Sequence, residues 1–264
     1  RFKFVQNAEP GNSSKYFDFG ADSSWQADSI VMFSGGLDSF AGVLEELIER
    51  KNHVALISHH SSPTIAKVQK ELQAAIGAKV NQSMFKHIPI KIQLAAGTHK
   101  EGTHRTRSFL FAALGVANAH AFGLKKVSFY ENGIVSLNLS PVTNAVGTRA
   151  TRTTHPQTLT RFSNLFSQIL GAPYKIENPF FWRTKKEVVE VIYKLGFGKA
   201  IAMTRSCADV RNSTKMHPHC GRCSQCIDRR FAMLAAELER FDPAEAYKVD
   251  LMDGEEEWAD MADQ

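Results

Sequence analysis

Short apolar runs alternate with amphipathic segments along most of the chain. Residues 28–33 form an apolar run rich in strand-forming residues, and residues 39–50 carry apolar side chains at helical spacing. Thr184 and Glu187 have the spacing of a capping box, which marks the start of a later helix. In full, the pattern predicts strands at residues 28–33, 53–58, 87–92 and 127–131, and helices at residues 39–50, 64–76, 106–122, 157–170 and 185–195.

This alternation predicts an α/β protein with a parallel sheet and helices on both of its faces. Ligands of such sheets bind beyond the carboxyl ends of the strands. The segments that follow the first, second and fourth expected strands should therefore meet at one edge, with any chemistry that they carry. Residues 1–27 contain a Gly-Asn-Ser-Ser stretch, and we expect them to form a hairpin or a linker.

The turn after the first expected strand has the composition of a phosphate-binding loop. Two adjacent glycines bare the backbone N–H groups, and the start of the next helix adds a partial positive charge. Hydroxyls on either side can donate hydrogen bonds, and Asp38 can cap the helix or bind Mg²⁺ beside a phosphate. The candidate cofactor-binding residues of this loop are Phe33, Ser34, Gly35, Gly36, Leu37, Asp38 and Ser39.

Other nucleotide-binding signatures do not fit this turn. It has neither the Gly-Lys-Ser/Thr of an NTPase P-loop nor a G-x-G-x-x-G dinucleotide fingerprint, and an ordinary capped glycine turn is the alternative. The sequence S-G-G-x-D-S resembles the signature of the PP-loop ATP pyrophosphatases, which have an adenine nucleotide alpha-hydrolase-like fold. The resemblance implies that ATP is cleaved between its α- and β-phosphates, so that pyrophosphate leaves into the loop and AMP is transferred to a substrate.

The four cysteines of the chain lie close together near its C-terminus. Their spacing is C-x12-C-x2-C-x2-C, in the order Cys207, Cys220, Cys223 and Cys226. Thiolates at such spacing can bind one tetrahedral Zn²⁺ in a closed, structural site. An iron–sulfur cluster is the main alternative, and a disulfide is disfavoured in a reducing compartment. His217 and His219 can compete as ligands, although we expect them to be solvated loop residues.

The two motifs together resemble a narrower family. The run from Ser206-Cys207 to Cys220-Gly221-Arg222-Cys223-Ser224-Gln225-Cys226-Ile227-Asp228-Arg229 is similar to the zinc motif of the 7-cyano-7-deazaguanine synthases, the QueC family of queuosine biosynthesis. The resemblance spans about residues 28–240. It implies that 7-carboxy-7-deazaguanine is adenylated and attacked by ammonia, after which a second ATP converts the amide into the nitrile, preQ0.

Two further matches identify candidate catalytic residues beside Asp38. Arg107 opens the long third helix where the family has an arginine, and Lys185 follows Thr184 where the family has a T-K pair. Both charges suit contacts with phosphate or adenylate. The alternative is that both residues are exposed side chains at the start of a helix and bind nothing.

The remaining candidates bind adenosine or substrate. Ile57 and Ser58 end the second expected strand, where we expect the adenosine. Glu131 and Asn132 follow the fourth expected strand and are candidate substrate-binding residues. Arg229 can contact the substrate carboxylate or the adenylate, with a surface salt bridge as the alternative.

The middle of the chain departs from the family. The tyrosine-, glycine- and aspartate-rich substrate loop is replaced by Glu131-Asn132-Gly133 and by an Arg- and Thr-rich stretch at residues 149–156, and residues 59–62 read His-His-Ser-Ser. The acceptor half therefore differs while the nucleotide half is retained. This is similar to divergent relatives in anti-phage gene clusters, some of which attach the deazaguanine carboxylate to a protein amine.

The charge and composition of the chain indicate which kinds of ligand and location to expect. The chain has 264 residues, 43% of them apolar, and a formal net charge of +5. Residues 249–264 hold seven acidic and no basic side chains, so the rest carries 32 basic and 20 acidic groups, a net +12. A basic body favours anionic ligands. No apolar run is long enough for a membrane span and no export signal is present, so we expect a soluble, cytoplasmic protein.

The sequence thus predicts an ATP-dependent carbon–nitrogen ligase that uses ATP, Mg²⁺ and Zn²⁺. The acceptor is ammonia or the amine of a partner protein; neither membrane nor nucleic acid is expected, and a homodimer is left open. The alternatives are a PP-loop tRNA-modifying sulfurtransferase and a non-catalytic nucleotide-binding scaffold. The expected division is residues 1–27 as the N-terminal segment, 28–200 as the PP-loop ATP-binding domain, 201–248 as a zinc-binding helical subdomain and 249–264 as an acidic tail.

Overall fold

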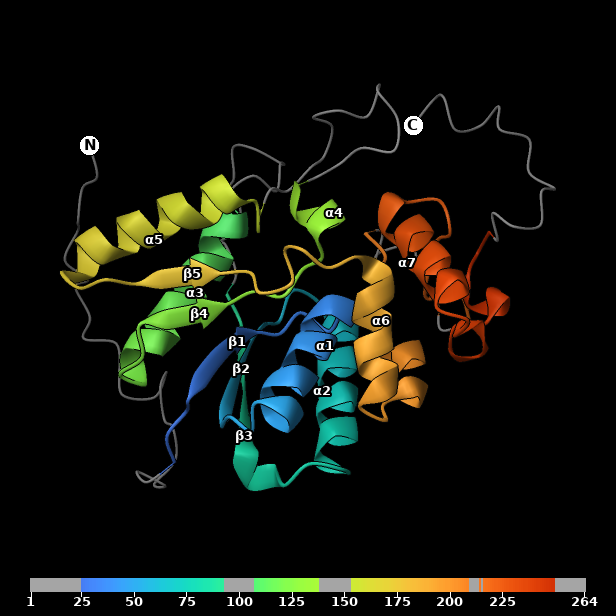
Figure 1. The fold of residues 1–264 in the computed structure, drawn as a ribbon, viewed down its shortest axis with the longest axis horizontal. Coiled ribbons are helices and arrows are strands. Elements are labelled where there is room, and N and C mark those ends of the chain that lie inside the picture. The colour runs from blue at the N-terminus through green and yellow to red at the C-terminus, as the bar shows by residue number, and fades with distance from the viewer. Residues whose placement is uncertain (1–24, 93–106, 138–152, 209–213, 215, 250–264) are drawn as a thin grey trace.

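The protein is built around a five-stranded parallel sheet with the strand order β3-β2-β1-β4-β5. A computed structural model describes residues 25–92, 107–137, 153–208, 214 and 216–249 (Figure 1). The strands are β1 (Ser29–Met32), β2 (Val54–His59), β3 (Phe85–Ile90), β4 (Lys126–Ser128) and β5 (Lys175–Glu177). The α-helices are α1 (Leu37–Leu44), α2 (Pro63–Gly77), α3 (Arg107–Ala121), α4 (Gly133–Leu137), α5 (Pro156–Leu170), α6 (Lys185–Lys194) and α7 (Ser224–Ala235).

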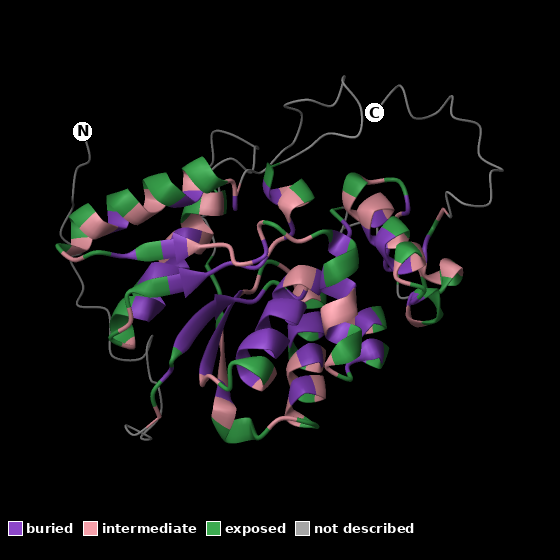
Figure 2. Ribbon diagram, viewed as in Figure 1, coloured by how far each residue is buried: buried purple, intermediate pink, exposed green. Residues whose placement is uncertain are grey.

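Both faces of the sheet are covered, as its apolar strands require. On one face, Val31 and Leu56 belong to a core shared with α1, α2 and α6. On the other, Ile30 and Ile57 pack into a second core with α3 and α5. Strand β1 is buried along its whole length and β2 from Val54 to Ser58 (Figure 2), because side chains that alternate along a strand meet helices on either side. The expected α/β fold is confirmed.

The expected elements appear with small shifts in their ends, and three elements were not expected. The sequence pattern did not predict strand β5 or helices α4 and α7 individually, although a helical C-terminal subdomain was expected. Strand β5 is only three residues long with charged ends, so its period is too short to read. The capping box at the start of α6 is present as predicted.

Helix α1 continues as a π-helix, η2 (Glu45–Glu49), where a regular helix was expected. The wider turn places Glu45 and Glu46 in the interior, and Arg50 pairs with both carboxylates at 2.8 and 2.6 Å. Glu46 also accepts a hydrogen bond from the Tyr130 hydroxyl at 2.5 Å. This network connects the start of η2 to the segment after β4.

The C-terminal part is described up to residue 249 and packs on α6. Met233 of α7 and Leu238 share the core that contains the α1 and α6 side chains. The 3-10 turns of the described residues are η3 (Gln82–Met84), η5 (Gly198–Met203), η6 (Glu239–Phe241) and η7 (Ala244–Ala246). Residues 1–24, 138–152 and 250–264 lie outside the described residues, and with them most of the expected N-terminal segment and acidic tail and the Arg- and Thr-rich stretch up to Arg152. The expected domain division stays a prediction.

Among the described residues, no helix has both the length and the apolarity needed to cross a bilayer.

Gly42 offers a test of how tightly α1 packs on the segment after β4. A Cβ at Gly42 would lie 2.0 Å from Cγ of Tyr130, so Gly42→Ala must displace the tyrosine ring. We expect Gly42→Ala to lower the free energy of unfolding by about 1–3 kcal/mol, despite the better helix propensity of alanine. Urea denaturation measures this. The control is Gly77→Ala in α2, where the nearest atom would be 3.5 Å away and we expect no loss of stability; equal losses in both variants would contradict the explanation.

Candidate functional site

The candidate site forms where the order of the strands reverses. Strands β2 and β3 lie to one side of β1, whereas the next strand in sequence, β4, lies on its other side. Connections that leave neighbouring strands in opposite directions open a crevice at the carboxyl edge of a parallel sheet. The loop after β1 and the segment after β4 both end at this crevice. The sequence pattern predicted that the segments after β1 and β4 meet at one edge of the sheet, and in the structure they are in contact.

The phosphate-binding loop is a compact turn held by its own hydroxyls. Gly35 has φ of +87°, a conformation that favours glycine. The hydroxyls of Ser34 and Ser39 lie 3.0 Å apart, and the Ser34 hydroxyl accepts from the N–H of Gly36 at 3.3 Å. The Ser39 hydroxyl is also placed to donate to Gly36 O at 3.1 Å. The two flanking serines therefore stabilise the turn and line it with polar atoms.

The backbone carbonyl groups of the loop accept hydrogen bonds from neighbouring segments of the chain. The amide of Gln69 in α2 donates to Ser34 O at 3.3 Å and to Phe33 O at 3.4 Å. The N–H of Arg205 donates to Gly35 O at 2.9 Å. Neither Gln69 nor Arg205 stands out in the sequence, because each lies far from the loop along the chain and matches no motif. Only the packing of α2 and of the chain after η5 on the loop reveals them.

The N–H groups at the start of α1 are the part of the loop that could bind an anion. Helix α1 has no side-chain cap, and its first hydrogen bond runs from Phe40 N–H to Gly36 O. Among the described residues, no acceptor is bonded to the N–H groups of Leu37, Asp38 and Ser39. Free N–H groups at a helix N-terminus attract anions, phosphate above all. The loop thus has N–H groups without an acceptor at a helix start, and phosphate binding by them stays a prediction.

Asp38 joins the loop to the two other parts of the site. Its Oδ1 accepts hydrogen bonds from the N–H and the side-chain amide of Asn132 at 3.2 and 3.1 Å. Its Oδ2 forms an ion pair with Nζ of Lys185, whose side chain is only 3% exposed. Asn132 in turn caps α4 by accepting from the N–H groups of Ile134 and Val135. Three candidates from distant parts of the sequence, Asp38, Asn132 and Lys185, are therefore in direct contact.

Glu131 lies beside this junction and has an altered acidity. Burial raises its pKa to about 7, and the charge of Asp38 acts in the same direction. A hydrogen bond from the Thr154 hydroxyl and the charge of Lys185 act in the opposite direction. The main chain of Glu131 is fixed by Asn178, whose amide donates to Glu131 O at 2.7 Å. A carboxyl group with a pKa near neutrality can accept a proton from a substrate at physiological pH.

Asp228 of α7 is a second acid at Lys185 that was not among the sequence candidates. Its Oδ2 lies 3.9 Å from Nζ of Lys185, and that oxygen is buried without a hydrogen-bond partner among the described residues. Its position two residues after Cys226, inside the cysteine motif, gave no signal of a role at the nucleotide loop. The buried lysine thus lies between one acid from the loop and one from the cysteine-rich region.

The four cysteines form a group with the dimensions of a metal site. One sulfur from each residue lies within 4.8 Å of the others, and the sulfurs of Cys220 and Cys226 are 3.9 Å apart. A tetrahedral Zn–S site with bonds of about 2.3 Å places its sulfurs about 3.8 Å apart, so the donors fit zinc. No histidine joins this group in the described part of the chain. His219 is buried and packs against Tyr247 at 5.1 Å, so the expectation that it is solvated is wrong.

Arg229 does not have the substrate-binding position expected from the sequence. Its side chain is fully buried and donates to Asp242 at 2.7 and 2.9 Å, to Thr204 Oγ1 at 2.8 Å and to Ile201 O at 2.9 Å. A guanidinium group whose donors are all used inside the protein has none left for a substrate. The structure gives Arg229 the role of fixing α7 to the chain after η5.

Of the other sequence candidates, Ile57 and Ser58 both bond Phe33 at the start of the loop, whereas no contact in the described residues joins Arg107 to the site. Arg107 begins α3, where its guanidinium lies 5.1 Å from the ring centre of Phe111. Ile57 is buried in the core of the α3 face. The Ser58 hydroxyl donates to Phe33 O at 2.7 Å and lies 2.9 Å from Nε2 of His87. Contacts of these three residues with adenosine or phosphate stay a prediction.

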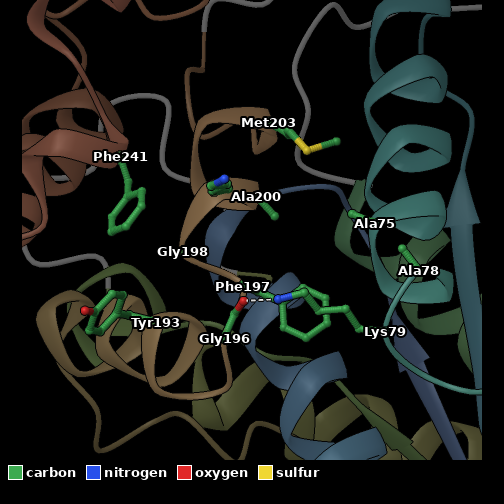
Figure 3. Close-up of a pocket in the computed structure, with 11 residues that line it drawn as sticks. Ala75, Ala78, Lys79, Tyr193, Gly196, Phe197, Gly198, Ala200, Met203 and Phe241 are labelled. Carbon is green, nitrogen blue, oxygen red and sulfur yellow. Dashed lines mark hydrogen bonds between the residues drawn. The ribbon is translucent and has the colours of Figure 1, made fainter.

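A groove of about 520 Å³ lies between the C-terminal part of α2, the end of α6 and the turn η5 (Figure 3). It is bounded by the C-terminal ends of α2 and α6 and by the aromatic side chains of Tyr193, Phe197 and Phe241. Lys79 extends across it to the carbonyl of Gly196. Because α2 and α6 begin at the carboxyl edge and end here, this groove is separate from the candidate site.

Comparison with known families agrees with the C-terminal motif. The family model described as Queuosine biosynthesis protein QueC matches residues 144–237. The match includes Lys185, all four cysteines and Asp228, and it supports a QueC-like family. It covers less than half of the chain and begins after the phosphate-binding loop, so that loop's likeness rests on its own sequence and geometry. A search of curated proteins finds no match.

The pKa of Glu131 predicts an unusual pH dependence of stability. Because the folded protein holds the Glu131 proton up to about pH 7 and the unfolded chain releases it near 4.5, stability falls as the pH rises through this interval. We expect Glu131→Gln to raise the free energy of unfolding at pH 8 by up to about 3 kcal/mol, and to change it little at pH 4.5. Urea denaturation at both pH values measures the difference.

Glu187 is the matched control, because its pKa is lowered by the capping hydrogen bonds from Thr184. Glu187→Gln should therefore destabilise the protein more at pH 8 than near pH 3. A pH-independent effect of Glu131→Gln would show that the pKa of Glu131 is not raised in the folded protein.

The cysteine group predicts a structural metal. We expect Cys223→Ser to lose bound zinc and to increase amide hydrogen exchange in α7, because a site with one fewer thiolate no longer stabilises the region. Metal analysis and hydrogen-exchange mass spectrometry measure both effects. His217→Ala should keep its zinc. Full metal content and a protected α7 in Cys223→Ser would contradict a four-cysteine structural site.

Proposed function

We propose that the protein is an ATP-dependent carbon–nitrogen ligase that adenylates 7-carboxy-7-deazaguanine and couples it to an amine. The observation that carries the proposal is the contact of Asp38 in the phosphate-binding loop with Asn132 and Lys185. It puts an anion-binding turn, a buried cation and the segment after β4 in one crevice. The likeness to the QueC family supports the use of ATP and a deazaguanine substrate.

The proposed reaction has two steps whose atoms balance. First, a carboxylate oxygen of the substrate attacks the α-phosphorus of ATP, and the bond to the bridging oxygen breaks, so that pyrophosphate leaves. The amine nitrogen then attacks the acyl carbon of the adenylate, AMP leaves with the bonding electrons, and the nitrogen loses a proton. Charge that develops on the departing pyrophosphate can be stabilised by N–H groups fixed in advance.

The residues of the crevice suit separate parts of this reaction. The N–H groups of Leu37 and Ser39 would hold pyrophosphate, and Lys185 would stabilise the negative charge of the triphosphate. Asp38 would hold Mg²⁺ when the ion accompanies ATP, since a carboxylate next to phosphates is otherwise repelled. Glu131, with its pKa of about 7, would take the proton from the attacking amine. Asn132 would hold Asp38 in place.

The acceptor is the open part of the proposal. Ammonia would lead to the amide and then to the nitrile, whereas the amine of a partner protein would lead to a deazaguanine–protein conjugate of the kind associated with anti-phage defence. The departure of residues 131–133 and 149–156 from the family pattern supports a changed acceptor. The same reaction would place the protein in the cytoplasm, where ATP and reduced thiols are available.

The sulfurtransferase alternative has less support. Such enzymes need a free thiol to carry sulfur, and all four cysteines of the chain belong to the cysteine group. A protein whose metal is iron would reopen this alternative.

Product analysis tests the proposal. The full chain is incubated with Mg-ATP and 7-carboxy-7-deazaguanine, alone, with ammonium, and with candidate partner proteins. We expect AMP and pyrophosphate, together with a nitrile, an amide or a protein adduct identified by mass spectrometry. ADP in place of AMP would contradict adenylation. Absence of pyrophosphate from every mixture would favour a non-catalytic scaffold.

Removing the charge of Asp38 tests the proposed reaction by mutation. We expect Asp38→Asn to slow pyrophosphate release by on the order of 100-fold or more, because the pair with Lys185 and the Mg²⁺ ligand are both lost. The matched control is Asp28→Asn, at the other end of β1, where Asp28 binds the N–H of His53 at 2.8 Å. That variant should keep the wild-type rate. Equal rates for all three proteins would place the chemistry elsewhere.

A further inference from the structure

The carbonyl groups of the phosphate-binding loop are engaged before any ligand arrives. Phe33 O and Ser34 O both accept from the side-chain amide of Gln69, and Gly35 O accepts from the N–H of Arg205. Gly36 O is engaged by the first hydrogen bond of α1. Four successive carbonyls therefore have donors that hold them. A peptide unit has its N–H opposite its C=O, so fixing the carbonyls also fixes the direction of the N–H groups.

Gln69 is the only side chain, among the described residues, that bonds two of these carbonyls at once. It is 1% exposed, and it reaches the loop because α2 lies directly on Gly35. A Cβ at Gly35 would lie 3.2 Å from Cγ1 of Val68 and 3.4 Å from Cγ of Gln69. The glycine thus permits both the positive φ of the turn and the close approach of the glutamine.

The other half of the Gln69 amide is unsatisfied. Its Oε1 is buried and has no hydrogen-bond partner among the described residues. Turning the amide over would place Oε1 against two carbonyl oxygens, so the orientation is set by the loop. A buried acceptor without a partner lowers stability. A methionine at this position would fill similar space and remove the unsatisfied Oε1, but it would also take the donor away from Ser34 O, so the two effects on stability oppose each other.

We propose that Gln69 is a positioning residue that holds the loop in the conformation that binds the two-phosphate fragment of ATP. This inference rests on the proposed function, and it names a contribution from α2 that the loop sequence does not contain. Without the Gln69 amide, Ser34 O loses its donor and the peptide unit after Ser34 can rotate, whereas Phe33 O keeps the hydrogen bond from the Ser58 hydroxyl. Part of the binding free energy of pyrophosphate is then used to order that peptide unit.

The test measures affinity and stability in the same variants. Isothermal titration calorimetry gives the affinity of the full, zinc-loaded chain for inorganic pyrophosphate and for AMP, both with Mg²⁺ present. We expect Gln69→Met to bind pyrophosphate about tenfold more weakly, to bind AMP nearly as the wild type does, and to have a nearly unchanged melting temperature. Gln69→Glu replaces the donor with an acceptor and should weaken pyrophosphate binding further.

Gln73 is the matched control. It lies one turn later in α2, and its Oε1 is 3.3 Å from Nδ1 of His87, away from the loop carbonyls. Gln73→Met should keep the wild-type affinity for pyrophosphate. Equal affinities of Gln69→Met and the wild type would overturn the inference, as would equal losses in the two methionine variants. A parallel loss of AMP binding and melting temperature would reduce Gln69 to a packing residue. Failure of the wild type to bind pyrophosphate or ATP would instead overturn the proposed function.

Discussion

The buried charge of Lys185 is the constraint on which the site depends. Its side chain is 3% exposed, and a cation removed from water must be paired. One partner is Asp38, in the first turn of α1, and Asp228 in α7 lies 3.9 Å away. The lysine therefore fixes α6 against the helix of the phosphate-binding loop and against the cysteine-rich region at once. An anionic ligand entering this crevice meets a positive charge that is already held in place.

The parts of the fold that could be predicted are those encoded locally. The continuous apolar runs of β1 and β2 follow from burial on both faces, and the start of α6 follows from a capping box of two residues. The phosphate-binding loop was predictable for the same reason, since two glycines between a strand and a helix specify the turn by themselves. The cysteine spacing predicted a common site because its members lie close along the chain.

The parts that could not be predicted depend on contacts between distant segments. Asp38 and Lys185 were each candidates, but nothing in the sequence indicates that they form a pair across 147 positions. Gln69 and Asp228 lie in helices whose patterns describe only which face is apolar. For Arg229 the sequence predicted a contact that the structure does not support. An arginine next to a metal motif suggests contact with a ligand, but in the structure Arg229 is paired with Asp242 in the interior. Burial decides its role, and a single sequence does not report it.

The cysteine group and the phosphate-binding loop are connected by a short series of hydrogen bonds. Helix α7 carries Cys226, and three residues later Arg229 bonds Thr204 at 2.8 Å. The next residue along that segment, Arg205, donates its N–H to Gly35 O in the loop. A metal that orders α7 therefore acts on the loop through this chain of bonds and on Lys185 through Asp228. A closed four-thiolate site has no open position for chemistry, but the cysteine group would support the candidate nucleotide site, because the chain that it orders forms one wall of the loop.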